Sequence, residues 1–285
     1  MIRALFLTSR PLSWVNTAFP FAAAYVMTTR EVDATLVVGT LFFLVPYNVA
    51  MYGINDVFDY ESDLRNPRKG GVEGALLDPR WHRLVLWVSG ILCLPFVVYL
   101  VAVGNPASWI ALAVSLFAVV AYSAKGLRFK ERPFLDSITS STHFVSPAVY
   151  GLLLAGATFT PHLVAVLVAF FLWGAASHAF GAVQDVVADR EAGIGSVATV
   201  IGARRTVRLA ITLYLLAGIL LLAVPWPGVL AAVLAVPYAA NAAPWWRVTD
   251  ATAPDANRGW RRFLGLNFVT GFAVTMLLIA TALLG

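Results

Sequence analysis

Apolar runs about as long as a membrane is thick recur along the chain, and they constrain its fold more than any other feature. The hydrocarbon layer of a bilayer is about 30 Å thick, and a helix needs about 20 mainly apolar residues to cross it. Backbone polar groups inside that layer find no water, so each run is expected to be a helix. Of the 285 residues, 60% are hydrophobic and 12% are charged, which excludes a water-soluble domain. The sequence therefore predicts an all-α, polytopic membrane protein, with residues 1–285 forming a single transmembrane domain.

The loops between the apolar runs alternate in charge. The nine expected spans cover residues 11–29, 35–58, 83–103, 107–124, 136–156, 161–186, 206–224, 227–246 and 263–284. Of the 20 Lys and Arg residues, only Arg30 lies in a loop that follows an odd-numbered span. Basic loops face the cytoplasm, so we expect a multi-pass protein of the plasma membrane with its N-terminus inside and its C-terminus outside. The net charge of +5 thus reflects membrane sidedness and does not indicate nucleic acid.

Two acidic motifs end two of these spans on the predicted cytoplasmic side. The stretch "INDVFDYESD" ends span 35–58, and "QDVVADRE" ends span 161–186. Residues three, four and seven apart share a helix face, so each motif should point several oxygen atoms in one direction. The predicted metal ligands are Asn55, Asp56, Asp59, Asp185 and Asp189.

The residue types in these motifs favour magnesium. Clustered carboxylates near the membrane repel one another, and a cation compensates them. Oxygen donors without His or Cys suit Mg²⁺, and the lone Cys93 lies inside an apolar run, which excludes a disulfide. The basic residues beside each motif suit a metal that arrives with a diphosphate. The alternative is that acids simply end these helices in water beside positive-inside loops, but two matched motifs on one side favour the metal site.

Two further polar residues lie deeper on the same helices. Asn48 lies seven residues before Asn55, and His178 lies seven residues before Asp185. Such residues either line a cavity or form hydrogen bonds between packed helices, and the sequence leaves both interpretations open.

The motifs resemble those of the UbiA family of intramembrane prenyltransferases. "NDVFDYESD" fits the NDxxDxxxD motif of the family, "DVVAD" fits its DxxxD motif, and "YSAKGLRFK" resembles a loop that the family carries between spans 4 and 5. Within the family, "SRPLSWVNTAFPFAAAY" and "LRFKERPFLDSITSSTHFVSPA" are similar to actinobacterial lycopene elongases.

This resemblance implies a helical bundle in which both motifs bind Mg²⁺ that holds an allylic diphosphate. The implied catalytic residues are Asp59, Asp63 and Asp185, with Asp63 as a candidate acceptor of the final proton. The expected substrate-binding residues are Arg65, Arg68, Lys69, Tyr122, Ser123, Arg128, Lys130 and Arg190. One departure is "NPRKGG", where many quinone-type members have an Arg-Pro pair, and this argues against a quinone-precursor acceptor.

The function implied by the resemblance is prenyl transfer from dimethylallyl diphosphate to lycopene through an allyl cation, giving C45 and C50 carotenoids. Carotenoid cyclase subunits are a possible partner. The alternatives are another lipophilic acceptor, namely a quinone precursor, a chlorophyll precursor, haem or a polyprenyl phosphate. A CDP-alcohol phosphotransferase is disfavoured because its compact motif is missing from the sequence. A cation-coupled transporter is disfavoured because such sites lie near the midplane on broken helices.

Overall fold

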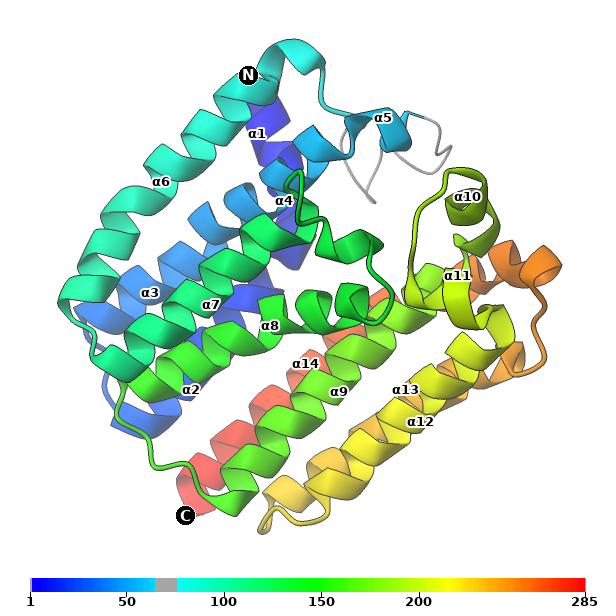
Figure 1. Cartoon of the computed structure of the whole chain (residues 1–285). Coiled ribbons are helices and arrows are strands. Elements are labelled where there is room, and N and C mark those ends of the chain that lie inside the picture. The colour runs from blue at the N-terminus through cyan, green and yellow to red at the C-terminus, as the bar shows by residue number, and fades with distance from the viewer. Residues whose placement is uncertain (1, 65–75, 285) are drawn as a thin grey trace. The chain divides into compact units, whose positions relative to one another are not determined.

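Helices make up all the regular structure in the part of the chain that the computed structural model describes, residues 2–64 and 76–284 (Figure 1). The predicted all-α class is confirmed for these residues. The predicted site residues Arg65, Arg68 and Lys69 lie outside the described residues, and so does the side chain of Asp63. The chain forms two compact units: unit 1 is Met1–Phe129 with His143–Ala157, and unit 2 is Lys130–Thr142 with Thr158–Gly285.

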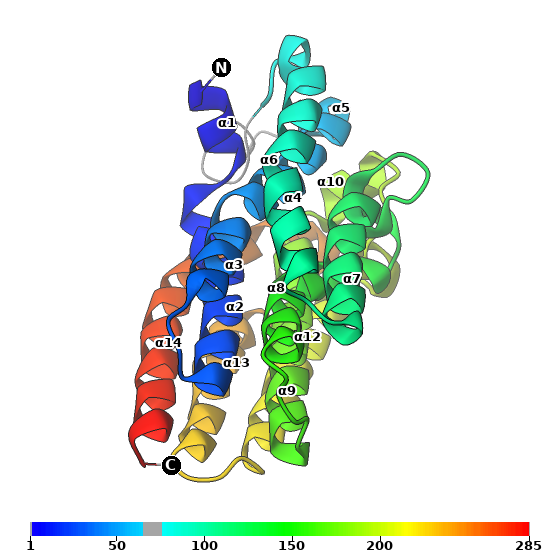
Figure 2. The same ribbon diagram turned by 90° about the vertical axis from the view of Figure 1, so that its left-hand side faces the viewer.

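Unit 1 packs its helices around buried aromatic rings. Phe21, Phe43 and Tyr150 are fully buried, and the Phe21 ring stacks on Tyr150 with 5.9 Å between centroids. Helix α3 lies against α2 (Figure 2), and α4 contacts both α6 and α7. The elements of unit 1 are α1 (Ile2–Thr8), η1 (Pro11–Ser13), α2 (Trp14–Thr29), α3 (Ala34–Leu44), α4 (Pro46–Phe58), α5 (Tyr60–Asp63), η2 (Pro79–Trp81), α6 (His82–Ala102), α7 (Pro106–Ser123) and the last part of α8 (Leu135–Leu154).

The expected span 35–58 is two helices, because α3 ends at Leu44 and α4 begins at Pro46. Proline has no N–H to donate, and its ring clashes with the preceding turn, so it favours the first position of a new helix. The Asn48 amide compensates the interrupted hydrogen bonding by donating to the carbonyls of Phe43 (2.8 Å) and Leu44 (3.1 Å). It also donates to the Thr17 hydroxyl of α2 at 2.8 Å. In this structure Asn48 therefore joins helices.

Unit 2 is built on long helices with small residues at their contacts. Helix α12 packs along α9 and against α13 (Figure 1), and the rings of Tyr214 and Tyr238 stack at 5.4 Å. A Cβ on Gly218 would lie 2.8 Å from that of Ala235, so glycine permits the close approach of α12 and α13. The elements are η3 (Phe129–Glu131, which begins in unit 1), the first part of α8, α9 (Pro161–Val183), α10 (Val186–Glu191), α11 (Val197–Ile201), α12 (Ala203–Leu221), η4 (Gly228–Leu234), α13 (Ala235–Ala242), η5 (Ala243–Trp245), η6 (Asp250–Ala256) and α14 (Asn257–Leu284).

Within the described residues, 6 helical stretches are long and apolar enough to cross a membrane: Ala34–Phe58, Pro79–Ala102, Pro106–Ser123, Pro161–Val183, Gly228–Trp245 and Asp250–Leu284. Helices also cover the other expected spans. Of these, α2 has 16 residues, and α12 carries Arg204, Arg205 and Arg208 in its first turns. The count of nine spans and the orientation of the termini stay predictions.

Candidate active site

The first motif occupies the end of α4, and this helix stops within the motif. Its last residue is Phe58, and Asp59 caps it with its backbone N–H bonded to the Asn55 carbonyl at 2.9 Å. A separate short helix, α5, begins at Tyr60. The shared helix face expected for Asp56, Asp59 and Asp63 is therefore interrupted at Asp59, although the sequence has neither proline nor glycine there.

Asn55 and Asp59 lie one turn apart and are joined to α7. The Asn55 amide donates to the Asp59 carboxylate at 2.7 Å and to the Ser123 hydroxyl at 2.9 Å. Ser123 and Asp59 are buried, with 1% and 5% of their surfaces exposed. The predicted motif residues Asn55 and Asp59 and the predicted substrate-binding residue Ser123 are thus brought together in unit 1.

Two more predicted substrate-binding residues lie beside this group. Arg128 has a positive φ of 40°. Its guanidinium donates to the Phe58 carbonyl at 3.3 Å and lies 3.9 Å from the Asp59 carboxylate. The neighbouring Tyr122 packs its ring edge-on against His143, with 5.3 Å between centroids. A cation and a buried carboxylate therefore adjoin each other at the end of α4.

Asp56 has a different partner, which its position in the motif does not predict. Its Oδ1 accepts a hydrogen bond from Nη2 of Arg10 at 3.0 Å, and the Arg10 guanidinium lies 4.2 Å from the centre of the Tyr52 ring. Arg10 precedes η1, 46 residues away from Asp56 in the chain. No local pattern in the sequence signals such a distant pair.

The second motif also lies where a helix breaks. Helix α9 ends at Val183, and Asp185 is the N-cap residue of α10. The backbone N–H of Asp189 donates to the Asp185 carbonyl at 2.8 Å, so the two predicted ligands flank one helical turn. Both are half-buried. The sequence correctly placed this pair at the end of an apolar helix.

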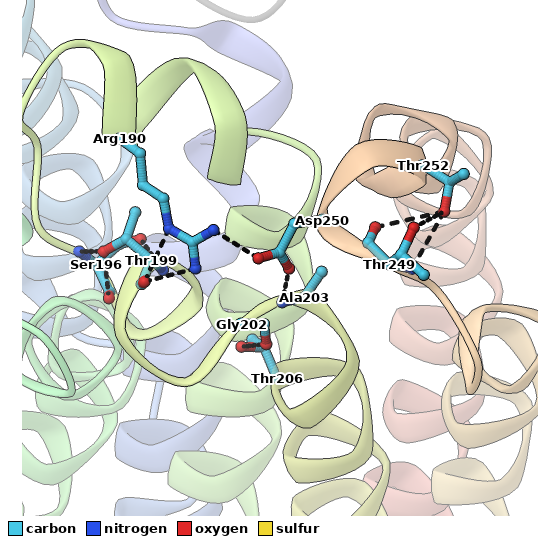
Figure 3. Close-up of polar contacts among 9 residues, drawn as sticks. All are labelled: Arg190, Ser196, Thr199, Gly202, Ala203, Thr206, Thr249, Asp250 and Thr252. Carbon is cyan, nitrogen blue, oxygen red and sulfur yellow. Dashed lines mark hydrogen bonds and ion pairs between the residues drawn. The ribbon is translucent and has the colours of Figure 1, made fainter.

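Arg190 follows the second motif directly, and its guanidinium is held by protein groups of unit 2 (Figure 3). Its Nε and Nη2 donate to the Thr199 carbonyl at 3.1 and 2.8 Å, and its Nη1 donates to the Asp250 carboxylate. Asp250 also accepts the backbone N–H of Ala203 at 2.8 Å. These bonds connect α10 to α11 and to η6, and they connect η6 to the start of α12. Arg190, a predicted substrate-binding residue, therefore already forms hydrogen bonds to Thr199 and Asp250 in this structure.

The donor atoms of both motifs fit Mg²⁺ in their chemistry. Asn55 and Asp59 in unit 1, and Asp185 and Asp189 in unit 2, offer only oxygen donors, which Mg²⁺ prefers. The Asp59 carboxylate is buried and lies 3.9 Å from the Arg128 guanidinium. Among residues 2–64 and 76–284, no group of three or more His, Cys, Asp or Glu side chains could hold a metal ion by itself.

A comparison with protein-family models identifies the family of this chain. The model of the UbiA prenyltransferase family matches residues 17–282, nearly the whole chain. The chain belongs to the UbiA prenyltransferase family. As a UbiA member it is a multi-pass membrane protein and a prenyltransferase, so the predicted enzyme class is confirmed.

Curated relatives of this UbiA chain bear names from carotenoid metabolism. It is 53% identical over 279 residues to the "Lycopene elongase/hydratase" of Corynebacterium glutamicum, covering 98% of this chain and 97% of that protein. It is 58% identical over 284 residues to a Dietzia protein named "C(50) beta-cyclic carotenoids biosynthesis protein LbtBC". That match covers 99% of this chain but only 66% of the Dietzia protein. The predicted resemblance to actinobacterial lycopene elongases is confirmed.

Solved UbiA structures share the fold. A UbiA homologue from Archaeoglobus fulgidus, solved with DMAPP and Mg²⁺, matches with a TM-score of 0.68 at 20% identity. The match covers 93% of this chain and 98% of that one. A UbiA homologue from Aeropyrum pernix K1 matches with a TM-score of 0.63 at 16% identity, over 92% and 97% of the two chains.

Proposed function

We propose that this UbiA enzyme transfers the dimethylallyl group of dimethylallyl diphosphate to lycopene, giving C45 and then C50 carotenoids. Lycopene as the acceptor is supported by one observation. The chain is 53% identical, over nearly the full length of both chains, to a protein named lycopene elongase/hydratase. The donor is supported by the match to a UbiA homologue bound to DMAPP and Mg²⁺. The buried carboxylate and the arginine at the end of α4 agree with binding of a metal–diphosphate.

The oxygen donors of each motif would hold Mg²⁺. The predicted ligands are Asn55, Asp56, Asp59, Asp185 and Asp189, of which Asp56 already has Arg10 as a partner. When bound, Mg²⁺ supplies Lewis-acid neutralisation of the charge that develops on the leaving diphosphate. Arg128 stabilises the same charge electrostatically, since its guanidinium is fixed beside Asp59 before the reaction. Arg65, Arg68, Lys69, Tyr122, Ser123, Lys130 and Arg190 complete the proposed substrate-binding set.

The reaction balances without an added oxidant or reductant. The C1–O bond of the donor breaks, its electron pair leaves with the diphosphate, and an allyl cation forms. The terminal double bond of lycopene then attacks C1 and leaves a tertiary cation. Water adds to that cation and releases a proton, a step that the word "hydratase" in the relatives' names supports. Loss of a proton to a base such as Asp63 is the alternative and gives a product lighter by one water.

We also propose how the chain is oriented in the membrane. The bias of the 20 Lys and Arg residues toward alternate loops supports nine spans, a cytoplasmic N-terminus and cytoplasmic motifs at the plasma membrane. Both units then act as one transmembrane domain. The comparisons do not support the expected association with carotenoid cyclases, which stays a prediction.

Product analysis tests the proposal. Membranes containing the chain are incubated with labelled dimethylallyl diphosphate, lycopene and Mg²⁺, and the pigments are analysed by mass spectrometry. We expect label in carotenoids heavier by one and two C5 units, with Asp185→Asn membranes as the control. Label in an added quinone or chlorophyll precursor but not in lycopene would refute the acceptor. Cation flux in liposomes without prenyl substrate would instead support a transporter.

A further inference from the structure

One segment of unit 2 bonds to the chain on both sides of the second motif. Gln184 directly precedes the motif "DVVAD", and Arg190 directly follows it. The side-chain carbonyl of Gln184 accepts a hydrogen bond from the amide of Asn257 at 2.6 Å. Arg190 donates to the carboxylate of Asp250. Asp250 begins η6, and Asn257 follows η6 as the first residue of α14, so residues 250–257 hold both ends of the motif.

An apolar contact adds to these two polar ones. Val186, the second residue of the motif, is fully buried. It belongs to the same buried apolar cluster as Ala253 and Ala256, the two residues that η6 buries. Their small side chains allow η6 to pack against both α9 and α10. The motif is therefore supported at its ends and also along its length.

Asp250 is held in place independently of the motif (Figure 3). Its carboxylate also accepts the backbone N–H of Ala203 at 2.8 Å. Ala203 is the first residue of α12, and the N–H groups of a first helical turn have no partner within their own helix. The preceding residue, Thr249, forms a capping box with Thr252, which fixes the start of η6. Arg190 is therefore bound to a carboxylate whose position is set by a long helix.

The helix that carries the motif is too short to be stable alone. Helix α10 has 6 residues, and isolated helices shorter than about 12 residues are marginal in water. Its tertiary contacts include those with η6 and α11. The fold of α10 therefore depends on the elements that surround it in unit 2.

We propose that residues 250–257 are a positioning element for the second motif. Asp250 acts through Arg190, and Asn257 acts through Gln184. Because both ends of the motif are held, its two aspartates keep one arrangement before a metal–diphosphate binds. Groups that orient metal ligands in this way raise the affinity of a site for its metal. The gain in metal binding rests on the proposed function, whereas the restraint on α10 does not.

Hydrogen exchange measures the restraint on α10 directly. The full chain is placed in lipid nanodiscs, and amide exchange in residues 186–194 is followed by mass spectrometry. We expect Asp250→Asn and Asn257→Ala each to speed this exchange by about 3–10-fold, the worth of one hydrogen bond.

Asp255→Asn is the matched control for hydrogen exchange. Asp255 lies in the same element, but its side chain is 64% exposed and pairs with Arg258. The proposal is overturned if neither Asp250→Asn nor Asn257→Ala exchanges faster than Asp255→Asn, or if exchange rises equally in α7 of unit 1.

Metal binding tests the consequence for the site. Bound Mn²⁺ is measured by electron paramagnetic resonance in the presence of inorganic pyrophosphate, and these probes substitute for Mg²⁺ and the diphosphate of the substrate. Outer-shell changes weaken metal binding by about 10–100-fold, so we expect a loss of about 10-fold in Asp250→Asn and in Asn257→Ala. Binding equal to that of Asp255→Asn in both variants would refute the positioning of the ligands. If Asp185→Asn binds Mn²⁺ as the unaltered chain does, the proposed metal site fails, while hydrogen exchange still decides the restraint on α10.

Discussion

Replacing Asn48 with leucine removes a buried amide that connects α2 to the break between α3 and α4. Leucine has the same number and branching of side-chain heavy atoms as asparagine but no polar group, so the change chiefly removes the hydrogen bonds. Asn48 donates to Thr17, Phe43 and Leu44 and is 0% exposed. The Phe43 carbonyl keeps a bond from the Thr17 hydroxyl at 2.7 Å, whereas the Leu44 carbonyl loses the amide.

The expected cost of Asn48→Leu follows from these bonds. Side-chain hydrogen bonds between membrane helices contribute about 0.6 kcal/mol each on average. Losing the bonds to Thr17 and Phe43 therefore costs about 1.2 kcal/mol. A part-buried acceptor left without its donor, here the Leu44 carbonyl, adds about 1 kcal/mol, the low end of the cost of an unsatisfied group. We expect the free energy of unfolding to fall by about 2 kcal/mol.

Unfolding in mixed micelles by titration with a denaturing detergent measures this loss. Asn16→Leu is the matched control, because the same substitution is made on α2 at a half-buried residue. If Asn48→Leu destabilises the protein no more than Asn16→Leu, the assignment of Asn48 to helix joining is wrong. A normal free energy of unfolding with lost prenyl transfer would instead support the cavity-lining interpretation.

Three further predictions concern single polar contacts. Ser123→Ala removes an acceptor of the Asn55 amide, and we expect kcat/KM for the diphosphate to fall about 3–10-fold, the worth of one hydrogen bond; unchanged kinetics would contradict this. Asp250→Asn removes the ion pair to Arg190. The Asp250 and Arg190 side chains are 39% and 42% exposed, so the free energy of unfolding should fall by about 1 kcal/mol or less in thermal unfolding. The Leu36 N–H and the Tyr25 hydroxyl hold the pKa of the Asp33 carboxyl below its ordinary value. This stabilisation is present above the unfolded-state pKa of about 4 and is lost as pH falls through the lower folded-state pKa. Asp33→Asn should therefore flatten the acid side of the profile of Tm against pH, and an unaltered profile would contradict the assignment.

The sequence predicted those parts of the fold that depend on local composition. The expected span 83–103 corresponds to α6 at His82–Ala102, and the expected span 107–124 corresponds to α7 at Pro106–Ser123. Both follow from the length of an apolar run, which a membrane helix must satisfy. The positions of both acidic motifs at helix ends were predictable for the same reason, since charged residues end an apolar run.

The contacts around the motifs were not predictable in the same way. The break at Pro46 has a signal in the sequence, because proline disrupts a helix, but the end of α4 at Phe58 has none. Which arginine pairs with which aspartate depends on tertiary packing. Arg10 reaches Asp56 across 46 residues, and Arg190 reaches Asp250 across 60. Spacing along one helix carries no information about either partner.

The proline at the start of α4 has a consequence for how this chain can change during evolution. One residue inserted between Pro46 and Asn55 would advance the last turn by about 1.5 Å and rotate it by about 100°. That rotation would carry Asn55 away from Ser123 and separate Asp56 from Arg10. Side chains along this segment can be exchanged, but its length cannot, so homologous enzymes with new acceptors should differ here by substitution and not by insertion or deletion.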